Sequence, residues 1–181
     1  MTKRADAIRN REKLLTAATE LFAARGTDVS LDAVAKAAGV GIGTLYRHFP
    51  TRDALVEAAY RAEVEHLHEA ASELLAEHAP DVALELWMER FIAYINAKRG
   101  MKGALQALVA GGSDIFAETR GQIVAAIAEL LAAGVEAGVL RSDVDAEDVW
   151  RATGAVWAVD TTEQARTLLR LLMDGLRHGA G

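Results

Sequence analysis

The sequence has no cysteine, only two prolines, few aromatic residues and no long apolar run. Without cysteine the chain can form no disulfide framework, thiolate metal site or cysteine nucleophile. Aromatic residues make up 6% of the 181 residues while Ala, Leu and Glu are abundant, which favours helices. No apolar segment is long enough to span a bilayer, and no signal-peptide h-region follows the charged start. We therefore expect a cytoplasmic all-α protein with a sizeable core.

The sequence also lacks the motifs of common enzyme classes. We find no HExxH, no GxSxG and no glycine-rich phosphate loop after a strand. Glu63 and His66 are acid and histidine neighbours without a third partner. His66 and His68 lie two residues apart and so point to different helix faces, as on a solvated helix rather than in a metal site. We predict no catalytic residue, no cofactor and no metal.

The charge is unevenly distributed along the chain. The first 52 residues carry nine Lys or Arg and five Asp or Glu, a net charge of +4, whereas the whole chain carries −6. The remaining residues therefore carry −10. A basic N-terminal part on an acidic body is typical of a DNA-binding module fused to a second module. A solvated surface with an uneven charge is the alternative interpretation.

The stretch from Leu31 to Phe49, LDAVAKAAGVGIGTLYRHF, has the pattern of two short helices joined by a tight turn. Val34 and Ala35 give the first helix an apolar face, and Gly39 suits a turn where φ becomes positive. Leu45 and Phe49 lie four residues apart on the second helix. This predicts a helix-turn-helix, whose second helix enters the DNA major groove. A plain helical hairpin is the alternative.

The segments REKLLTAATELFAARG, VSLDAVAKAAGV and GTLYRHFPTRDAL resemble the N-terminal DNA-binding domain of the tetracycline-repressor (TetR) family of transcriptional regulators. The resemblance runs from Ile8 to Ala58, about a third of the chain. It implies a three-helix DNA-binding domain followed by a helical effector-binding and dimerisation domain, in a homodimer that is most often a repressor. We place the first domain at residues 1–50 and the second at 51–181.

The candidate DNA contacts lie on and beside the second helix of this unit. Arg47 is long enough to reach a guanine edge or a phosphate. Tyr46 and His48 are similar to phosphate contacts of the family, and Arg52 matches a position usually occupied by Lys. Gly41 departs from the family, which often has a polar residue there. The predicted DNA-binding residues are Ser30, which also suits a helix cap, with Ile42, Gly43, Thr44, Tyr46, Arg47, His48 and Arg52.

The rest of the chain has helical periodicity throughout, which gives about nine helices in total. After the helix-turn-helix we expect helices over residues 52–78, 80–98, 101–110 and 113–137, then one capped by Asp145 that includes Trp157, and one from Thr161 to Arg177. Asp145 with Asp148, and Thr161 with Gln164, have the spacing of capping boxes. No repeat or low-complexity linker separates these segments.

Large apolar side chains recur on several helices of the body and could line an apolar pocket. The resemblance implies a small effector molecule in this region, and we expect it to be apolar or amphipathic. Ordinary core packing is the alternative for each residue. The predicted pocket residues are Trp87, Met88, Phe91, Tyr94, Met101, Phe116, Ile123, Trp150 and Trp157.

The last helix carries an apolar stripe too wide for one buried side. Such a stripe predicts packing against the body on one side and a partner subunit on the other. The predicted interface residues are Val156, Leu168, Leu169, Leu172 and Leu176. We thus predict a homodimeric, operator-binding bacterial regulator. The alternative is a helical dimerisation or scaffold protein with a degenerate helix-turn-helix, and salt-dependent, sequence-dependent DNA binding would separate the two.

Overall fold

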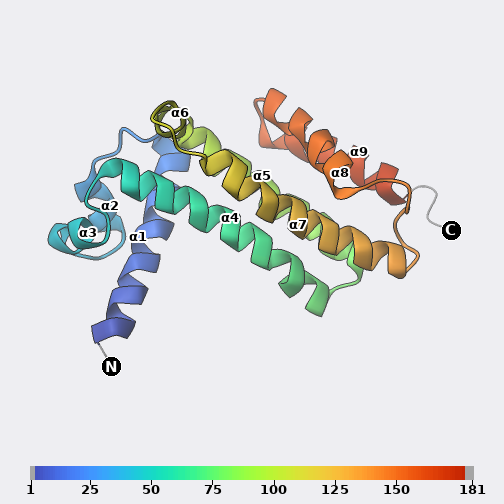
Figure 1. Ribbon diagram of the computed structural model, residues 1–181, viewed down its shortest axis with the longest axis horizontal. Helices are drawn as coiled ribbons and strands as arrows, with labels where there is room; N and C mark the ends of the chain where they lie inside the picture. Colours follow the sequence, from blue (N-terminus) through green and yellow to red (C-terminus); the bar gives the residue numbers. More distant parts are fainter. Residues whose placement is uncertain (1–2, 178–181) are drawn as a thin grey trace. The chain divides into compact units, whose positions relative to one another are not determined.

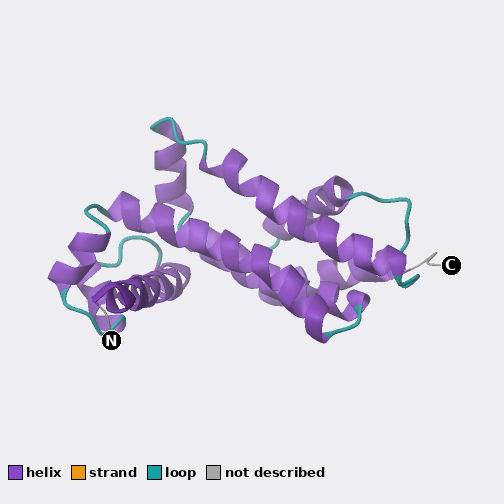
Figure 2. Ribbon diagram, turned by 60° about the horizontal axis from the view of Figure 1, so that its bottom comes forward, coloured by secondary structure: helices purple, strands orange, loops and turns teal. Residues whose placement is uncertain are grey.

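The computed structural model describes residues 3–177, and over these residues it contains helices and loops but no strand (Figures 1 and 2). None of the described helices is both long and apolar enough to cross a membrane. Because the described elements are all helices, the predicted all-α fold is confirmed. The elements are α1 (Lys3–Arg25), α2 (Leu31–Ala37), α3 (Ile42–His48), α4 (Arg52–Glu77), α5 (Pro80–Gly100), α6 (Lys102–Ala110), α7 (Ile115–Glu136), α8 (Ala146–Thr153), the 3₁₀-helix η1 (Gly154–Ala158) and α9 (Thr162–Arg177).

The chain forms two compact units that do not coincide with the predicted boundary at residue 50. Unit 1 comprises residues 1–63 and 96–115, and unit 2 comprises residues 64–95 and 116–181. Helices α4 and α5 each begin in one unit and end in the other. The predicted boundary lies in the turn between α3 and α4, whereas the boundary between the units lies within α4, at residues 63 and 64. The assignment of DNA binding to residues 1–50 and regulation to residues 51–181 stays a prediction.

In unit 1, α1 packs against both helices of the helix-turn-helix (Figure 1). Leu14 and Phe22 of α1 are fully buried, as are Val34 of α2 and Leu45 of α3. These residues have the helical spacing seen in the sequence, so each short helix is stabilised by the apolar face it buries. The core of unit 1 thereby fixes α3 and determines which of its side chains face outward.

Local signals in the sequence set the ends of these helices. The Ser30 hydroxyl accepts a hydrogen bond from the Ala33 amide at 3.1 Å, and the Thr51 hydroxyl accepts one from the Ala54 amide at the same distance. Each hydroxyl thus caps a helix N-terminus. Gly39, between α2 and α3, has φ = +68°, a conformation that costs glycine little and other residues more. The predicted caps and turn are confirmed.

The end of α5 makes an unusually close backbone contact with α1 inside unit 1. A Cβ atom added to Gly100 would lie 2.8 Å from the Cα of Ala23 and closer still to the carbonyl group of Phe22. No side chain fits between these two backbones. The residue is therefore glycine for a packing reason, which its position just after the predicted helix over residues 80–98 did not reveal.

Lys98, two residues before Gly100, is partly buried in unit 1, and its ammonium lies 5.5 Å from the ring centroid of Tyr60. Burial disfavours the charged form and lowers the pKa of Lys98 to about 8, from 10.5. In the unfolded chain the ordinary pKa returns, so the unfolded state binds more protons between these two values. The contribution of Lys98 to stability therefore rises as the pH increases from about 8 to 10.5.

We expect Lys98→Met to remove this rise and to stabilise the protein at neutral pH, where the wild type carries a partly buried charge. The measurement is the urea midpoint of both proteins at several pH values between 7 and 10. The difference between variant and wild type should shrink as the pH rises, because the wild-type lysine becomes neutral. Parallel curves would show that Lys98 titrates as an ordinary surface lysine.

In unit 2, α4, α5, α7 and α9 are joined by side-chain bonds. The Trp87 indole of α5 donates to the Leu67 carbonyl of α4 at 2.7 Å, and the Ser72 hydroxyl of α4 donates to Glu129 of α7 at 2.8 Å. Arg177 of α9 pairs with both Asp81 and Glu85 of α5. The core of this unit therefore lies between α5 and its neighbours, and α9 covers one side of α5.

The C-terminal helices differ from the prediction at one point. The capping box of Asp145 and Asp148 is present at the start of α8, as predicted. However, α8 ends at Thr153 and does not continue through Trp157, because residues 154–158 tighten into η1. The Thr153 hydroxyl donates to the Trp150 carbonyl at 2.7 Å at this break. Thr161 caps α9 by accepting a hydrogen bond from the Gln164 amide.

Candidate functional site

Helix α3 has a buried side and an exposed side. Leu45 is fully buried and Phe49, just after the helix, is 2% exposed. Tyr46 is 51% exposed and Ile42 is 37% exposed, and they lie four residues apart on one face. Thr44 and His48 are half-buried, whereas Gly43 and Arg47 are exposed. The predicted recognition residues therefore lie on the side of α3 that the core of unit 1 leaves open.

Two of these side chains already have intramolecular partners. The Arg47 guanidinium lies along its own helix, where its Nε donates to the Gly43 carbonyl at 3.2 Å. The Ser30 hydroxyl is used as the cap of α2. Both groups are exposed and keep further hydrogen-bonding capacity, since a guanidinium has five donors and a hydroxyl can also donate.

Arg52, in the first turn of α4, has a structural role that the sequence did not show. Its Nη1 donates to the Val29 carbonyl at 2.7 Å and also to the Thr27 carbonyl. Both acceptors belong to the loop between α1 and α2, directly before the Ser30 cap. One nitrogen of the long arginine side chain thus reaches both carbonyls. Arg52 thus holds the loop that begins the helix-turn-helix.

From this geometry we expect Arg52→Lys to weaken DNA binding even though it keeps the positive charge. Lysine has a shorter side chain with a more strongly hydrated ammonium, so we expect it to hold the two carbonyls less firmly and the loop before α2 to loosen. The salt dependence of binding should stay at the wild-type slope, because the number of charges is the same. The checks are thermal unfolding and a salt titration of DNA affinity. Full affinity in Arg52→Lys, with a shallower slope in Arg52→Ala, would instead identify Arg52 as a phosphate contact alone.

A second contact in unit 1 that the sequence did not predict joins the Arg11 guanidinium to the Phe49 ring. The guanidinium carbon of Arg11 lies 5.3 Å from the ring centroid of Phe49. This arrangement covers the buried Phe49 ring with a charge and joins α1 to the end of α3. In the sequence Arg11 was visible only as a basic residue off the apolar face of its helix, which gave no signal of its partner.

The residues predicted to line an effector pocket are mostly packed core. Trp87, Phe91 and Ile123 are at most 1% exposed, and the Trp87 and Phe91 rings stack with centroids 5.7 Å apart. Phe91 also meets Trp150 edge to face at 6.4 Å, which joins α5 to α8. Met88 and Tyr94 are buried in unit 2 and Met101 in unit 1, Phe116 is half-buried, and Trp157 is 36% exposed.

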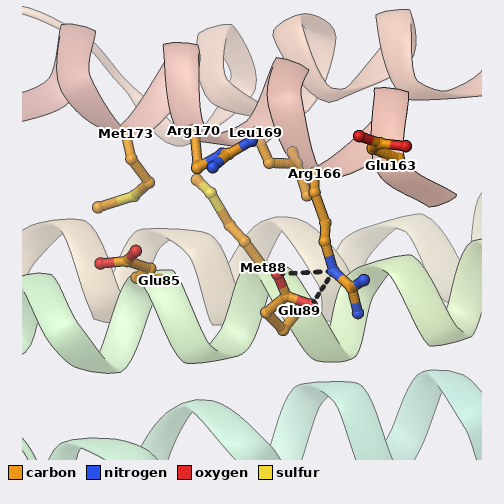
Figure 3. Close-up of a pocket in the computed structure, with 8 residues that line it drawn as sticks. All are labelled: Glu85, Met88, Glu89, Glu163, Arg166, Leu169, Arg170 and Met173. Atoms are coloured by element: carbon orange, nitrogen blue, oxygen red, sulfur yellow. Dashed lines mark hydrogen bonds and ion pairs between the residues drawn. The ribbon is translucent and has the colours of Figure 1, made fainter.

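A groove of about 190 Å³ lies between α5 and α9 in unit 2 (Figure 3). Of the predicted pocket residues it is lined only by Met88. Its other walls are largely charged, and Arg166 crosses it to pair with Glu89 at 3.0 Å. Such a surface suits a polar ligand better than the apolar one predicted. The remaining lining residues are Glu85, Glu163, Leu169, Arg170 and Met173.

The structure separates the two sides of α9. Leu169 and Leu176 are at most 4% exposed and belong to the core of unit 2, as does Val156 of η1 at 1%. Leu168 and Leu172 are half-buried at the edge of this buried stripe. Leu171, which lies next to Leu168 on the helix surface, is 64% exposed and was not among the predicted interface residues. The outer face of α9, defined by Leu168, Leu171 and Leu172, is therefore an apolar surface that the chain itself covers only in part.

Comparison with known proteins addresses both parts of the chain. Residues 14–59 match the family described as bacterial regulatory proteins, tetR family, and residues 79–178 match the C-terminal domain of SbtR-like transcriptional regulators. The second match covers more than half of the chain. The chain belongs to the TetR family. Its members are DNA-binding transcriptional regulators and not enzymes, so the resemblance noted in the sequence is confirmed.

Solved structures of TetR-family proteins resemble the whole chain. The TetR transcriptional regulator SCO0520 from Streptomyces coelicolor is 45% identical, with a TM-score of 0.86 over 92% of this chain and 98% of that one. A TetR regulatory protein from Mycobacterium vanbaalenii is 37% identical, with a TM-score of 0.79 over 97% and 99%. These similarities extend through the C-terminal helices, which the sequence motifs did not reach.

The similarity to curated HTH-type transcriptional regulators is shorter. The HTH-type transcriptional regulator SAR0097 of Staphylococcus aureus (strain MRSA252) is 37% identical over 79 residues, which are 42% of this chain and 41% of that protein. The chain thus matches less than half the length of this curated relative.

Proposed function

We propose that this TetR-family protein is a homodimeric repressor that binds a pseudo-palindromic operator and releases it when a small molecule binds the body. The observation that carries the proposal is the division of α3, which buries Leu45 completely and exposes Tyr46 and Arg47. A short helix that exposes an aromatic hydroxyl and a guanidinium beside it is suited to a major groove and its phosphates. The net charge of +4 on the first 52 residues supports the same partner.

The outer face of α9 supports the homodimer. A two-fold interface uses the same patch on both subunits, so an apolar helix face that the chain leaves partly uncovered can pack against its own copy. The two helix-turn-helix units of such a dimer, here called heads, are related by a two-fold axis and would meet two half-sites in successive major grooves. This arrangement requires the operator to be pseudo-palindromic.

The release step is a shift between two arrangements of the dimer. An effector that binds more tightly to the arrangement whose helix-turn-helix spacing does not fit the operator lowers the affinity for the operator. The operator lowers the affinity for the effector by the same coupling free energy. The core around Trp87, Phe91 and Trp150 is the candidate site for an apolar effector, which would have to open the packing that these rings now make. The groove between α5 and α9 is the candidate site for a polar effector.

The operator is tested by fluorescence anisotropy with DNA from upstream of the protein's own gene, titrated with salt and unrelated competitor DNA. Tight binding with a steep salt slope and little loss to competitor supports the proposal. For the effector, a panel of apolar, aromatic and charged small molecules is screened by tryptophan fluorescence and thermal stability. A panel that changes neither signal, and does not release DNA, would contradict effector control.

Within this proposal we expect Arg47→Ala to lower operator affinity and to reduce the salt slope by about one for each bound head. Its thermal stability should stay close to that of the wild type, since the bond lost is an exposed one within a single helix. Arg151→Ala on α8 is the charge-matched control, because that side chain is 70% exposed and lies outside α1–α3. An unchanged slope in Arg47→Ala would remove this residue from the phosphate contacts.

A further inference from the structure

The tip of α3 carries an apolar side chain that the core of unit 1 does not use. Ile42, the first residue of the helix, is 37% exposed, whereas Leu45, one turn later, is fully buried. Leu45 is therefore unavailable to DNA, and Ile42 is the aliphatic side chain that α3 presents. It lies on the same face as the exposed Tyr46.

Ile42 lies between two glycines that the fold does not require. Gly41 has φ = −72° and ψ = 145°, an extended conformation open to any residue, and Gly43 lies within the helix. A Cβ atom added to either would meet nothing within 4 Å. Glycine inside a helix is less favourable than alanine, and Gly41 provides no side-chain cap for α3. Stability would thus favour other residues at both positions.

The chemistry of the major groove gives these three residues a common role. The tip from Gly41 to Gly43 has no side-chain donor or acceptor, so its side chains cannot read a base by hydrogen bonding. The thymine C5-methyl group is the apolar feature of the base edges in the major groove, and aliphatic side chains contact it. Glycines on both sides of an aliphatic side chain allow the backbone to come close to DNA.

We propose that Ile42 reads a thymine methyl group in each operator half-site, and that Gly41 and Gly43 are small because the DNA occupies the space beside them. This inference rests on the proposed function, since it assumes that α3 enters the major groove. It assigns one A·T base pair of each half-site to apolar contact. Specificity at that pair then depends on shape and on the methyl group.

The experiment removes the methyl group and nothing else. A duplex is selected from a random-sequence pool by the wild-type protein, and each thymine is then replaced in turn by deoxyuridine, which keeps every hydrogen-bonding group. Wild-type affinity should fall roughly fourfold for each half-site substituted at one particular thymine, the effect of one buried methyl-sized group. Ile42→Ala should bind the thymine duplex more weakly and should be insensitive to deoxyuridine at that position.

The glycines are tested separately. Gly43→Ala should be as stable as the wild type or more stable, because its Cβ has open space, yet it should bind the selected duplex more weakly. Gly121→Ala on α7, where a Cβ also meets nothing within 4 Å, is the control and should bind DNA like the wild type. Wild-type DNA affinity in Gly43→Ala would overturn the close approach at this position.

The possible outcomes distinguish the role of Ile42 from the proposed function, operator binding, on which it rests. Selection of a specific duplex in which no thymine methyl matters would overturn the role of Ile42 and leave operator binding intact. A methyl effect that persists in Ile42→Ala would do the same, since another residue would then read the methyl. If the pool yields no preferred sequence at all, the proposed function fails first.

Discussion

A single charge on the outer face of α9, Leu171→Asp, is expected to yield monomers that bind the operator roughly a hundredfold more weakly than the wild type. Leu171 is 64% exposed within the chain, so a carboxylate there should cost the isolated subunit little. In a dimer packed through this face, the same carboxylate would be buried without a partner, which is costly. A monomer then loses the second head and the gain in affinity that two linked heads provide.

Light scattering after size-exclusion chromatography measures the oligomeric state, and anisotropy with the operator measures affinity. Val109→Asp on α6 is the control, because Val109 is another apolar side chain, 41% exposed, on a helix outside the proposed interface. That variant should stay dimeric. A dimeric Leu171→Asp protein would place the interface elsewhere, and the proposal for α9 would be abandoned.

The difference between Leu171 and the interface residues predicted from sequence shows where periodicity reaches its limit. A wide apolar stripe indicates that a helix buries two sides, but not which side faces its own chain. Leu169 and Leu176 are core because α5 lies against them, and Arg177 pairs with Asp81 and Glu85 on the same side. Asp81 precedes Arg177 by 96 residues, and Glu85 precedes it by 92 residues. No local pattern encodes such contacts.

The helix caps and the turn could be predicted because the residues that form each of them lie close together in the sequence. Ser30, Thr51 and Asp145 cap helices through bonds to amides three residues later, so each cap lies within a few letters of sequence. Gly39 marks a positive φ that few other residues tolerate. The helix-turn-helix and its exposed face follow from such signals combined with the spacing of Val34 and Leu45.

The role of Arg52 lies between these two cases. Its position in GTLYRHFPTRDAL suggested a phosphate contact by resemblance, and its charge is compatible with one. Its bonds to the Thr27 and Val29 carbonyls join positions 25 and 23 residues apart, which the motif alone could not reveal. A residue at the edge of a DNA-binding surface can thus act through the loop that it holds.

Gly100→Ala is expected to destabilise the protein by about 3 kcal/mol, the upper part of the range for overpacking, because the neighbouring atoms are backbone. The new Cβ would overlap the Phe22 carbonyl and the Ala23 Cα, and two helix backbones cannot yield as a side chain would. Such a loss is a large share of the stability of a typical domain. Urea unfolding followed by circular dichroism gives the free energy of unfolding for comparison with the wild type.

Gly103→Ala is the matched control, since Gly103 lies three residues later in α6 and a Cβ there meets nothing within 4 Å. That variant should be neutral or more stable by up to about 1 kcal/mol, the helix propensity of alanine over glycine. Equal stabilities for the two variants would show that the contact between α1 and α5 yields easily. Because Phe22 is itself fully buried in the core that holds the helix-turn-helix, Gly100→Ala should also weaken operator binding, whereas Gly103→Ala should not.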